Sequence, residues 1–274
     1  MAVFDFTDEF QRTVDRWDGT IGPPSAENRK LNRIRVYKNG FVEHVLASSH
    51  PLLPGVWFGW AVVYGGFLTL SSAPGRGGRV WLFAGGVLGF SLLEYLLHRF
   101  AFHWDPGDDR RAKVRLFLMH GLHHEFPNDK RRLVAPPLMS WPIAAILFAL
   151  YWLLLDRNSA FVLFGGTCAG YLAYDWIHYY THHFRSPKTR VGKLLRRAHA
   201  VHHFKLPLLN MGISSPLWDW VFGTFAWSEE TMRAALRETK AAEAESDAAE
   251  RREPARAGVG RSGGHRSAEI SSAE

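Results

Sequence analysis

Residues 51–70 read PLLPGVWFGWAVVYGGFLTL and contain no charged side chain over twenty positions. At a rise of about 1.5 Å per residue, a helix of this length crosses the hydrocarbon core of a bilayer, which is ~30 Å thick. After the turn SSAPGRGG (71–78), a second apolar run starts at Val80 and meets its first charge at Glu94. The two runs predict a transmembrane helical hairpin.

The second half of the chain contains a similar pair of apolar runs, residues 138–155 and 160–174, separated by the short turn 156–158. We predict that the second helix of each pair continues out of the membrane, through EYLLHRFAFH (94–103) and DWIHYYTHH (175–183). The predicted fold class is therefore an all-α integral membrane protein. It has four transmembrane helices in two hairpins, capped by a cytoplasmic helical domain rich in histidine.

Buried helices of a soluble protein are the alternative interpretation of these runs. Two of the runs have 18 or more uncharged residues, and tryptophans fall near the expected membrane interfaces, namely Trp57, Trp60, Trp141 and Trp152. Both features favour membrane-spanning helices over soluble ones.

The basic residues predict the orientation in the membrane. Lysines and arginines gather before the first run, between the second and third, and after the fourth, whereas the short turns carry only Arg76, Arg79 and Arg157. By the positive-inside rule, both termini and both histidine-rich segments face the cytoplasm. The same rule and anionic lipid headgroups explain the formal charge of +7, so we expect no nucleic-acid partner. The expected location is a multi-pass position in a membrane, and the Ala/Arg/Gly-rich composition favours a bacterial inner membrane.

The composition divides the chain into three parts. We expect residues 1–50 to form a cytoplasmic segment, residues 51–227 a membrane-embedded domain, and residues 228–274 a largely disordered tail, because the tail has no aromatic residue. The single cysteine, Cys168, excludes a disulfide framework and a cysteine-rich metal site within one chain.

Eleven of the 14 histidines fall between residues 98 and 203. They form four clusters, at His98 and His103; at His120, His123 and His124; at His178, His182 and His183; and at His199, His202 and His203. Spacings of three and four place side chains on one face of a helix. Many imidazoles directed to one place would partly protonate and repel one another, whereas a bound cation holds them together. These eleven residues are therefore the candidate metal ligands.

The clusters repeat in the two halves of the chain. In each half a hairpin ends in an acid, Glu94 or Asp175, which is followed by histidines and, further on, by a triplet. Two such units can hold two metal ions side by side at the membrane surface. Glu94 and Asp175 are expected to accept the outer N–H of a ligand histidine, with simple interfacial acids as the alternative. Because carboxylates are sparse, the coordination should be almost entirely imidazole, and the adjacent lipid suggests an alkyl-chain substrate.

The chain resembles the fatty acid hydroxylase/sterol desaturase superfamily, and within it the fatty acid 2-hydroxylases, over roughly residues 50–227. The resemblance rests on EYLLHRFAFH (94–103), HGLHHEFPND (120–129), RRLVAPP (131–137), GYLAYDWIHYYTHH (170–183), LLRRAHAVHHF (194–204) and GISSPLWDWVFGT (212–224). The histidine clusters define only the superfamily, whereas the RLVAPP and SSPLWDWVFGT blocks are more specific to the 2-hydroxylases.

The resemblance implies a membrane di-iron monooxygenase that uses O2 to hydroxylate a fatty acyl chain at carbon 2, with products often destined for sphingolipids. Zinc can replace iron in purified members. The resemblance carries the ligand role to ten of the eleven histidines and leaves His183 the least certain. Residues 1–50 are too short for a cytochrome b5-like domain and lack its His-Pro-Gly-Gly motif. A separate cytochrome b5-like or ferredoxin-type protein is therefore expected to supply electrons.

Other functions fit parts of the pattern. A carotenoid or sterol hydroxylase would use the same metal chemistry but should lack the two specific blocks, and an acyl desaturase spaces its histidines differently. A metal transporter or sensor would place ligands in mid-membrane rather than at helix ends. A bis-histidine haem protein needs about two histidines per haem. The WDWVF segment (218–222) is read as an interfacial anchor through Trp218 and Trp220, or as a lid over the acyl channel.

Overall fold

The computed structural model describes residues 3–28, 31–71, 76–184 and 187–228, together with positions 230, 231, 233 and 237. The chain divides into two compact units, residues 1–226 and 227–274, and the fold and site described below belong to the first. Most of the tail that we predicted to be disordered lies outside the described residues.

Regular structure in the described ranges is helical, apart from one isolated antiparallel bridge between Phe6 and Tyr37. Some elements are π-helical turns and are labelled η. In chain order the elements are α1 (Asp8–Arg16), η2 (Val42–Leu46), α2 (Leu53–Ser71), α3 (Arg76–Leu96), η3 (Leu97–Ala101), α4 (Arg110–Leu116), η4 (Phe117–Gly121), α5 (Leu122–Glu125), α6 (Pro137–Leu154), α7 (Arg157–His183), α8 (Arg190–Phe204) and α9 (Leu217–Phe222).

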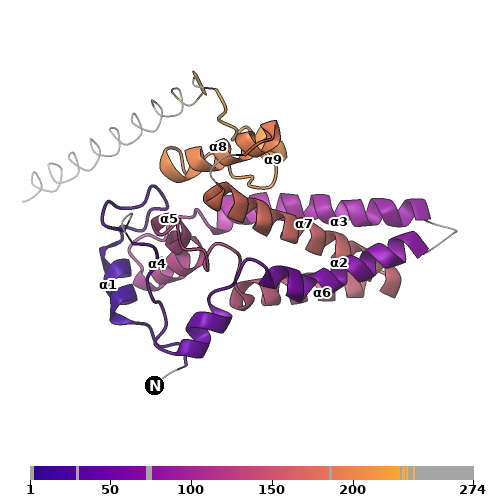
Figure 1. The fold of residues 1–274 in the computed structure, drawn as a ribbon, viewed down its shortest axis with the longest axis horizontal. Helices are drawn as coiled ribbons and strands as arrows, with labels where there is room; N and C mark the ends of the chain where they lie inside the picture. Colours follow the sequence, from indigo (N-terminus) through magenta and orange to yellow (C-terminus); the bar gives the residue numbers. More distant parts are fainter. Residues whose placement is uncertain are drawn as a thin grey trace, which may run out of the picture. The chain divides into compact units, whose positions relative to one another are not determined.

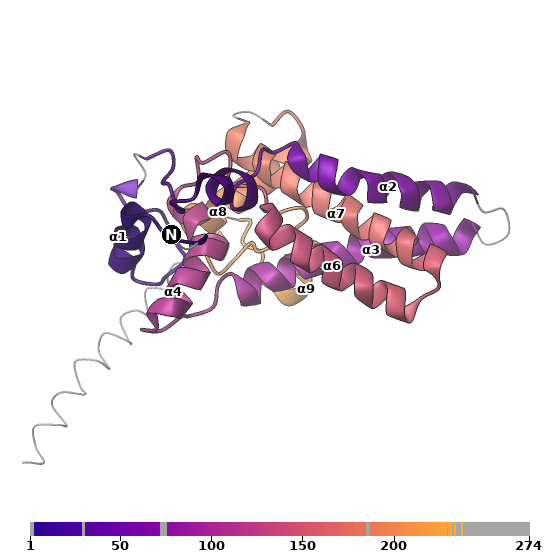
Figure 2. The same ribbon diagram turned by 90° about the horizontal axis from the view of Figure 1, so that it is seen from below.

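Four long helices, α2, α3, α6 and α7, lie side by side as a bundle (Figures 1 and 2). Three segments in the described part of the chain are long and apolar enough to cross a membrane, namely 53–71, 77–101 and 137–154. The fourth predicted run lies in α7, which packs against α2, α3 and α6. The helices therefore fall where the sequence predicts them, and α7 is the helix that the other three contact.

Small residues allow α7 to approach two neighbours closely. A Cβ atom added to Gly166 would lie 2.1 Å from the Phe83 carbonyl oxygen of α3, and one added to Gly165 would lie 2.7 Å from the Ala61 carbonyl oxygen of α2. On α3, a Cβ atom at Gly86 would lie 2.4 Å from the Leu163 carbonyl oxygen. Backbone contact of this kind is typical of packing between membrane helices.

Residues 1–50 take part in a hydrophobic core with the segment that follows α3. Phe10, Trp17 and Val36 pack in one buried cluster with Leu116 and Phe117. The first helix is amphipathic, because Phe10 and Val14 are buried while the acids of its first turn are exposed. The N-terminal segment is thus part of the compact unit that contains the histidines.

A buried ion pair also connects the N-terminal segment to the chain that precedes α6. Arg132, in the RRLVAPP block, pairs with Glu43, and both side chains are 8% exposed. The Glu43 carboxylate also accepts hydrogen bonds from the backbone N–H groups of Val36 and Tyr37, at 3.2 and 3.0 Å.

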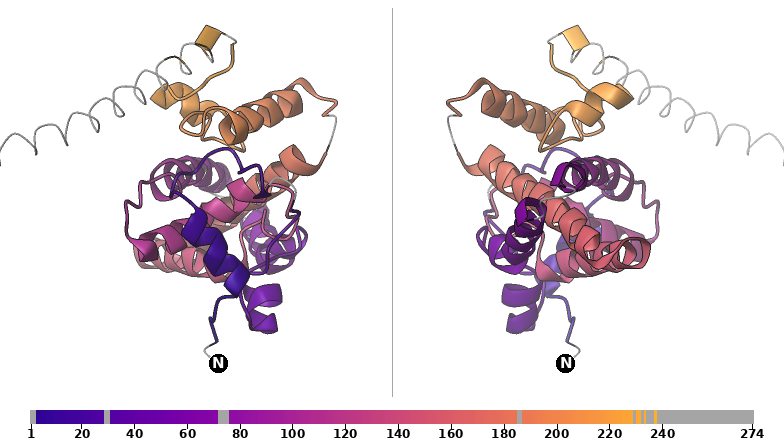
Figure 3. Two further views of the ribbon diagram at one scale, coloured as in Figure 1. Left: turned by 90° about the vertical axis from the view of Figure 1, so that its left-hand side faces the viewer. Right: turned by 90° about the vertical axis from the view of Figure 1, so that its right-hand side faces the viewer.

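The histidine-bearing elements gather at one end of the bundle. Figure 1 shows that the C-terminal end of α2, the start of α3 and the α6–α7 connection lie at the opposite end. α8 lies near the other end of the bundle (Figure 1), and the end-on views of Figure 3 show it to one side of the long helices. This arrangement brings four separate stretches of chain together at one place.

Candidate metal centre

Two π-helical turns place the histidines of the first half. His98 lies in η3, where the Phe102 N–H donates to the Leu97 carbonyl, five residues back, at 3.0 Å. A spacing of five residues in an α-helix turns side chains about 140° apart, whereas the wider π turn reduces that angle. His103 follows η3 by two residues, and its ring centroid lies 5.1 Å from that of His98. The second π turn, η4, contains His120 and is followed directly by α5, which carries His123 and His124.

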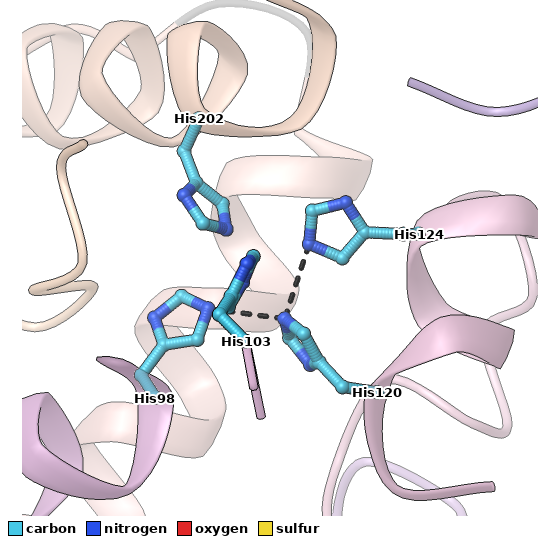
Figure 4. Close-up of side chains that lie close together, drawn as sticks. All are labelled: His98, His103, His120, His124 and His202. Carbon is cyan, nitrogen blue, oxygen red and sulfur yellow. Dashed lines mark hydrogen bonds between the residues drawn. The ribbon is translucent and has the colours of Figure 1, made fainter. Parts of the chain in front are cut away.

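Ten histidines form two groups of five, and within each group the inward ring nitrogens lie within 4.8 Å of one another. Their side chains are buried, except for His103 and His182, which are partly exposed. The first group, shown in Figure 4, consists of His98, His103, His120, His124 and His202. The second group consists of His123, His178, His182, His199 and His203.

The two groups do not coincide with the two halves of the sequence. The first group takes four histidines from the first half and His202 from α8, whereas the second group takes four from the second half and His123 from α5. Each histidine triplet therefore serves both groups. Its i and i+4 members enter one group, and its i+3 member enters the other.

The hydrogen bonds of the first group fit a bound cation. The Nδ1–H groups of His98, His124 and His202 donate to backbone carbonyls of Met211 (2.6 Å), Gly22 (3.1 Å) and Leu209 (3.0 Å). Since a carbonyl can only accept, Nδ1 carries the proton in each neutral ring, and Nε2 presents a lone pair.

The lone pairs on the inward Nε2 atoms repel one another. The Nε2 atoms of His98 and His124 lie 3.0 and 3.1 Å from Nε2 of His120, which has one proton at most to donate to the two. A metal ion relieves this conflict, since it accepts all of the lone pairs at once. The donor set therefore fits a metal ion that favours imidazole, such as iron or zinc.

The second group shows the same convergence. Nε2 of His199 lies 3.1 Å from that of His178 and 2.7 Å from that of His182, and His178 is also 3.0 Å from His123. Its outer nitrogens differ from those of the first group. Among the described residues, Nδ1 of His178, His199 and His203 has no hydrogen-bond partner.

Burial keeps these histidines in the form that binds metal. It holds the pKa of His199, His202 and His203 well below the usual histidine value, and neighbouring imidazoles lower it further. Burial does the same to the pKa of His120 and His124. The rings are thus neutral near pH 7, and only a neutral imidazole can coordinate a metal ion.

The two acids do not make the contacts that the sequence suggested. Glu94 accepts hydrogen bonds from the backbone N–H groups of Ile213 (2.6 Å) and Ser214 (2.8 Å) and from the Ser214 hydroxyl. Asp175 accepts from the Ala135 N–H at 3.3 Å. No imidazole among the described residues donates to either carboxylate. The outer N–H groups of His98, His124 and His202 go to carbonyls, whereas Nδ1 of His178, His199 and His203 has no hydrogen-bond partner there. Any support that these acids give to the ligands is indirect.

One further candidate, His183, is not part of either group. Its ring packs beside Tyr179, with centroids 4.6 Å apart. It follows His182 by one residue on α7, so the two side chains point about 100° apart around the helix.

Three positions that the sequence did not single out support this centre. The Gly22 carbonyl, in the N-terminal segment, contacts His124 directly. Asn210 and Asp219 are 1% exposed and act indirectly, because they hold the chain on either side of Met211. Asp219 belongs to the WDWVF segment, whose tryptophans suggested an anchor or lid. A charged residue within an aromatic stretch was the one available sign of its buried role.

An apolar cavity leads to the first group from between the long helices. Phe90 and Leu93 of α3, Ile143 of α6 and Phe164 of α7 line it, and it ends at His98. An adjoining pocket reaches His120, His123 and His178 and shares Phe102, Ala135, Met139 and Tyr174 with the cavity.

A different pocket, lined in part by polar side chains, borders the second group. It is lined by Asn128, Thr181 and Arg196 together with His182, His199 and His203. Different pockets thus border the two groups, and the pocket beside the second group is the less apolar of the two.

An all-helical bundle with apolar, membrane-length helices and two buried groups of histidines defines the class of polyhistidine membrane metalloproteins. Comparison with known families specifies it further, since the family model described as fatty acid hydroxylase matches residues 83–224. The chain therefore belongs to the fatty acid hydroxylase family.

Several similar proteins are named as 2-hydroxylases. The chain is 37% identical over 194 residues to an Arabidopsis thaliana dihydroceramide fatty acyl 2-hydroxylase, covering 69% of this chain and 79% of that one. It is 41% identical over 147 residues to the Rattus norvegicus fatty acid 2-hydroxylase, covering 53% of this chain and 39% of that one.

A third relative is the Saccharomyces cerevisiae ceramide very long chain fatty acid hydroxylase, 34% identical over 72% of this chain and 52% of its own length. The chain thus spans about half or less of the rat and yeast enzymes. A solved structure of full-length scs7p, in which only the hydroxylase domain is visible, superposes with a TM-score of 0.63 at 28% identity. That match covers 82% of this chain and 92% of the solved one.

Proposed function

We propose that the protein is a di-iron, O2-dependent hydroxylase that places a hydroxyl group on carbon 2 of a fatty acyl chain. The acyl chain is that of a free fatty acid, a thioester or a sphingolipid. Electrons come from a separate cytochrome b5-like or ferredoxin-type protein. The position of hydroxylation is supported by the names of the plant and rat relatives.

The observation that carries the proposal is the apolar cavity that ends at the first histidine group. Its side chains, including Phe90 and Ile143, offer contacts to methylene groups and exclude water. Since His98 lies at the end of the cavity, a chain that enters from the membrane side brings its head end to the metal ligands. The apolar lining thus orients the substrate, and the histidines hold the ions.

The histidines would hold two iron ions, one in each group of five. When bound, the irons supply the redox chemistry that activates O2 and replaces a C–H bond by a C–OH bond. The surrounding residues keep the imidazoles neutral by burial and keep the rings aimed inward through the carbonyls of Gly22, Leu209 and Met211.

We further propose that α7 is a fourth membrane-spanning helix and that the histidine end of the bundle faces the cytoplasm. The end of α2, the start of α3 and the α6–α7 connection lie at the opposite end of the bundle, which supports this arrangement (Figure 1). Basic residues at the histidine end support the same orientation.

Mass spectrometry of lipids tests the reaction. The chain is expressed in a host that lacks 2-hydroxy lipids and is supplied with a reductase and its electron carrier. A His123→Ala/His202→Ala double variant removes one ligand from each group, and His44→Ala, an exposed histidine outside both groups, is the matched control. We expect 2-hydroxy fatty acids from the wild type and from His44→Ala, and none from the double variant.

Two other outcomes would contradict the proposal in different ways. A purified protein that contains iron but yields no 2-hydroxy product would favour a sterol or carotenoid substrate, which the host can be fed. Absence of metal from the purified protein, together with absence of hydroxylated product from the host lipids, would exclude an oxygenase.

A further inference from the structure

We infer that the two metal sites are unequal, and that the first group binds its ion more tightly and releases it later than the second group. The inference rests on the proposed metal-dependent function. It concerns residues 209–214, which we call the support segment. None of these residues is a proposed metal ligand.

The support segment contacts two ligands of the first group through its backbone. The carbonyl of Leu209 accepts from Nδ1 of His202, and the carbonyl of Met211 accepts from Nδ1 of His98. These ligands come from α8 and from η3, more than 100 residues apart in sequence. One short piece of backbone therefore fixes the ring orientation of two ligands.

Buried side chains hold the support segment itself. The Asp219 carboxylate accepts from the N–H groups of Met211 and Gly212, both at 2.8 Å, and from the Thr224 hydroxyl at 2.7 Å. Glu94 accepts from the next two N–H groups along the segment, as described above. Successive amides of the segment are thus bound by two buried carboxylates.

Asn210 fixes the start of the segment. Its backbone has a φ of 55°, in the left-handed region. Its side-chain oxygen accepts from the Ala226 N–H at 2.8 Å, and its amide nitrogen lies 3.3 Å from the Ala198 carbonyl of α8. At Gly212 a Cβ atom would lie 2.2 Å from the Ser215 carbonyl oxygen. The segment therefore has little freedom to shift before or after a metal ion binds.

The second group has no comparable support. Within the described ranges, Nδ1 of His178, His199 and His203 lacks a hydrogen-bond partner, so these rings are less fixed about their side-chain bonds. The second group also borders the pocket at Arg196, through which a chelator can approach. The weaker orientation of its ligands favours loss of this ion first.

Partners of the outer nitrogen typically change metal affinity 10- to 100-fold. Because three ligands of the first group have such partners and three of the second lack them, we expect the two affinities to differ by about tenfold or more. Asn210 and Asp219 act as positioning residues in this scheme.

Calorimetric titration of the metal-free, full-length protein in detergent with Zn²⁺ tests the order of binding. We expect two resolved binding events. His202→Ala should remove the tighter event, and His199→Ala should remove the weaker one. A chelator added to the loaded wild type should withdraw one ion quickly and the other slowly.

Asp219→Asn tests the support segment, with Glu43→Gln as its matched control. Both residues are buried carboxylates that accept two backbone N–H groups, but Glu43 serves the N-terminal segment. We expect Asp219→Asn to weaken the tighter event about tenfold and leave the weaker event unchanged. Glu43→Gln should lower thermal stability without changing either affinity.

The inference would be overturned if the wild type bound both ions with equal affinity or released them at equal rates. It would also be overturned if His199→Ala removed the tighter event. Each of these results would leave the proposed function intact. The wild-type titration decides this even if Asp219→Asn does not fold. A protein that binds no metal would overturn both the inference and the proposed function.

Discussion

His182 and His183 are adjacent on α7 but lie in different surroundings. Nε2 of His182 is 2.7 Å from that of His199 in the second group, whereas His183 is outside both groups and packs beside Tyr179. We predict that His182→Ala loses the ion of the second group and that His183→Ala keeps both ions. Metal analysis of the purified variants checks this, and loss of an ion from His183→Ala would make His183 a ligand.

The buried histidines also make the stability of the folded protein depend on pH. Unfolded histidines titrate near pH 6.5, whereas burial lowers the folded pKa of His199, His202 and His203 well below that value. Above pH 6.5 both states are neutral, so these groups contribute no pH dependence. Below it the unfolded state binds protons that the folded state does not, and stability falls.

We therefore predict that the metal-free protein becomes less stable as the pH falls below about 6.5, by up to ~1.4 kcal/mol per pH unit for each such histidine. Thermal unfolding followed by circular dichroism between pH 7.5 and 5.5 measures this. The loaded protein should change less until protons displace the metal. A metal-free melting temperature that is constant over this range would contradict the assignment of neutral, buried rings.

At the level of elements, the close approach of α3 to α7 depends on Gly86. The neighbouring Gly85 provides a matched control. A Cβ atom at Gly86 would lie 2.4 Å from the Leu163 carbonyl oxygen and 2.7 Å from the Thr167 amide nitrogen, whereas one at Gly85 meets nothing within 4 Å. Since the helices cannot separate without disturbing the cavity between them, Gly86 has to remain without a side chain.

We predict that Gly86→Ala destabilises the protein by ~1–3 kcal/mol, as overpacking does, and lowers the yield of folded protein. Gly85→Ala should be neutral or slightly stabilising, because alanine is favoured over glycine in a helix by ~1 kcal/mol. Melting temperatures in one detergent compare the two. Equal effects of both changes would contradict the close packing of α3 against α7.

On the scale of the whole molecule, the proposed orientation places the two ends of the bundle on opposite sides of the membrane. Asn158, at the start of α7, and Asp108, between η3 and α4, are both exposed and lie at opposite ends. In a Cys168→Ala background, we predict that Asn158→Cys reacts with an impermeant maleimide in intact spheroplasts. Asp108→Cys should react only after permeabilisation, and labelling of both cysteines in intact spheroplasts would contradict four spans.

The sequence alone determined the four long helices and the eleven clustered histidines, since apolar runs and three- and four-residue spacings are local properties of the chain. It also predicted the membership in the fatty acid hydroxylase family, which the comparisons confirm. It did not predict that His98 and His103 would meet through a π turn, because a helix is expected to keep the α-helical period.

Only the tertiary structure decided which histidines share an ion and what orients them. His202 joins the first group and His123 the second because the fold brings α5 and α8 together, so that each triplet directs its i+3 member to the other group. The carbonyl that orients His98 is 113 residues away in Met211, and the one that orients His124 is 102 residues away in Gly22. A backbone carbonyl has no signature in a sequence, so its role becomes visible only when the chain brings it to the ring.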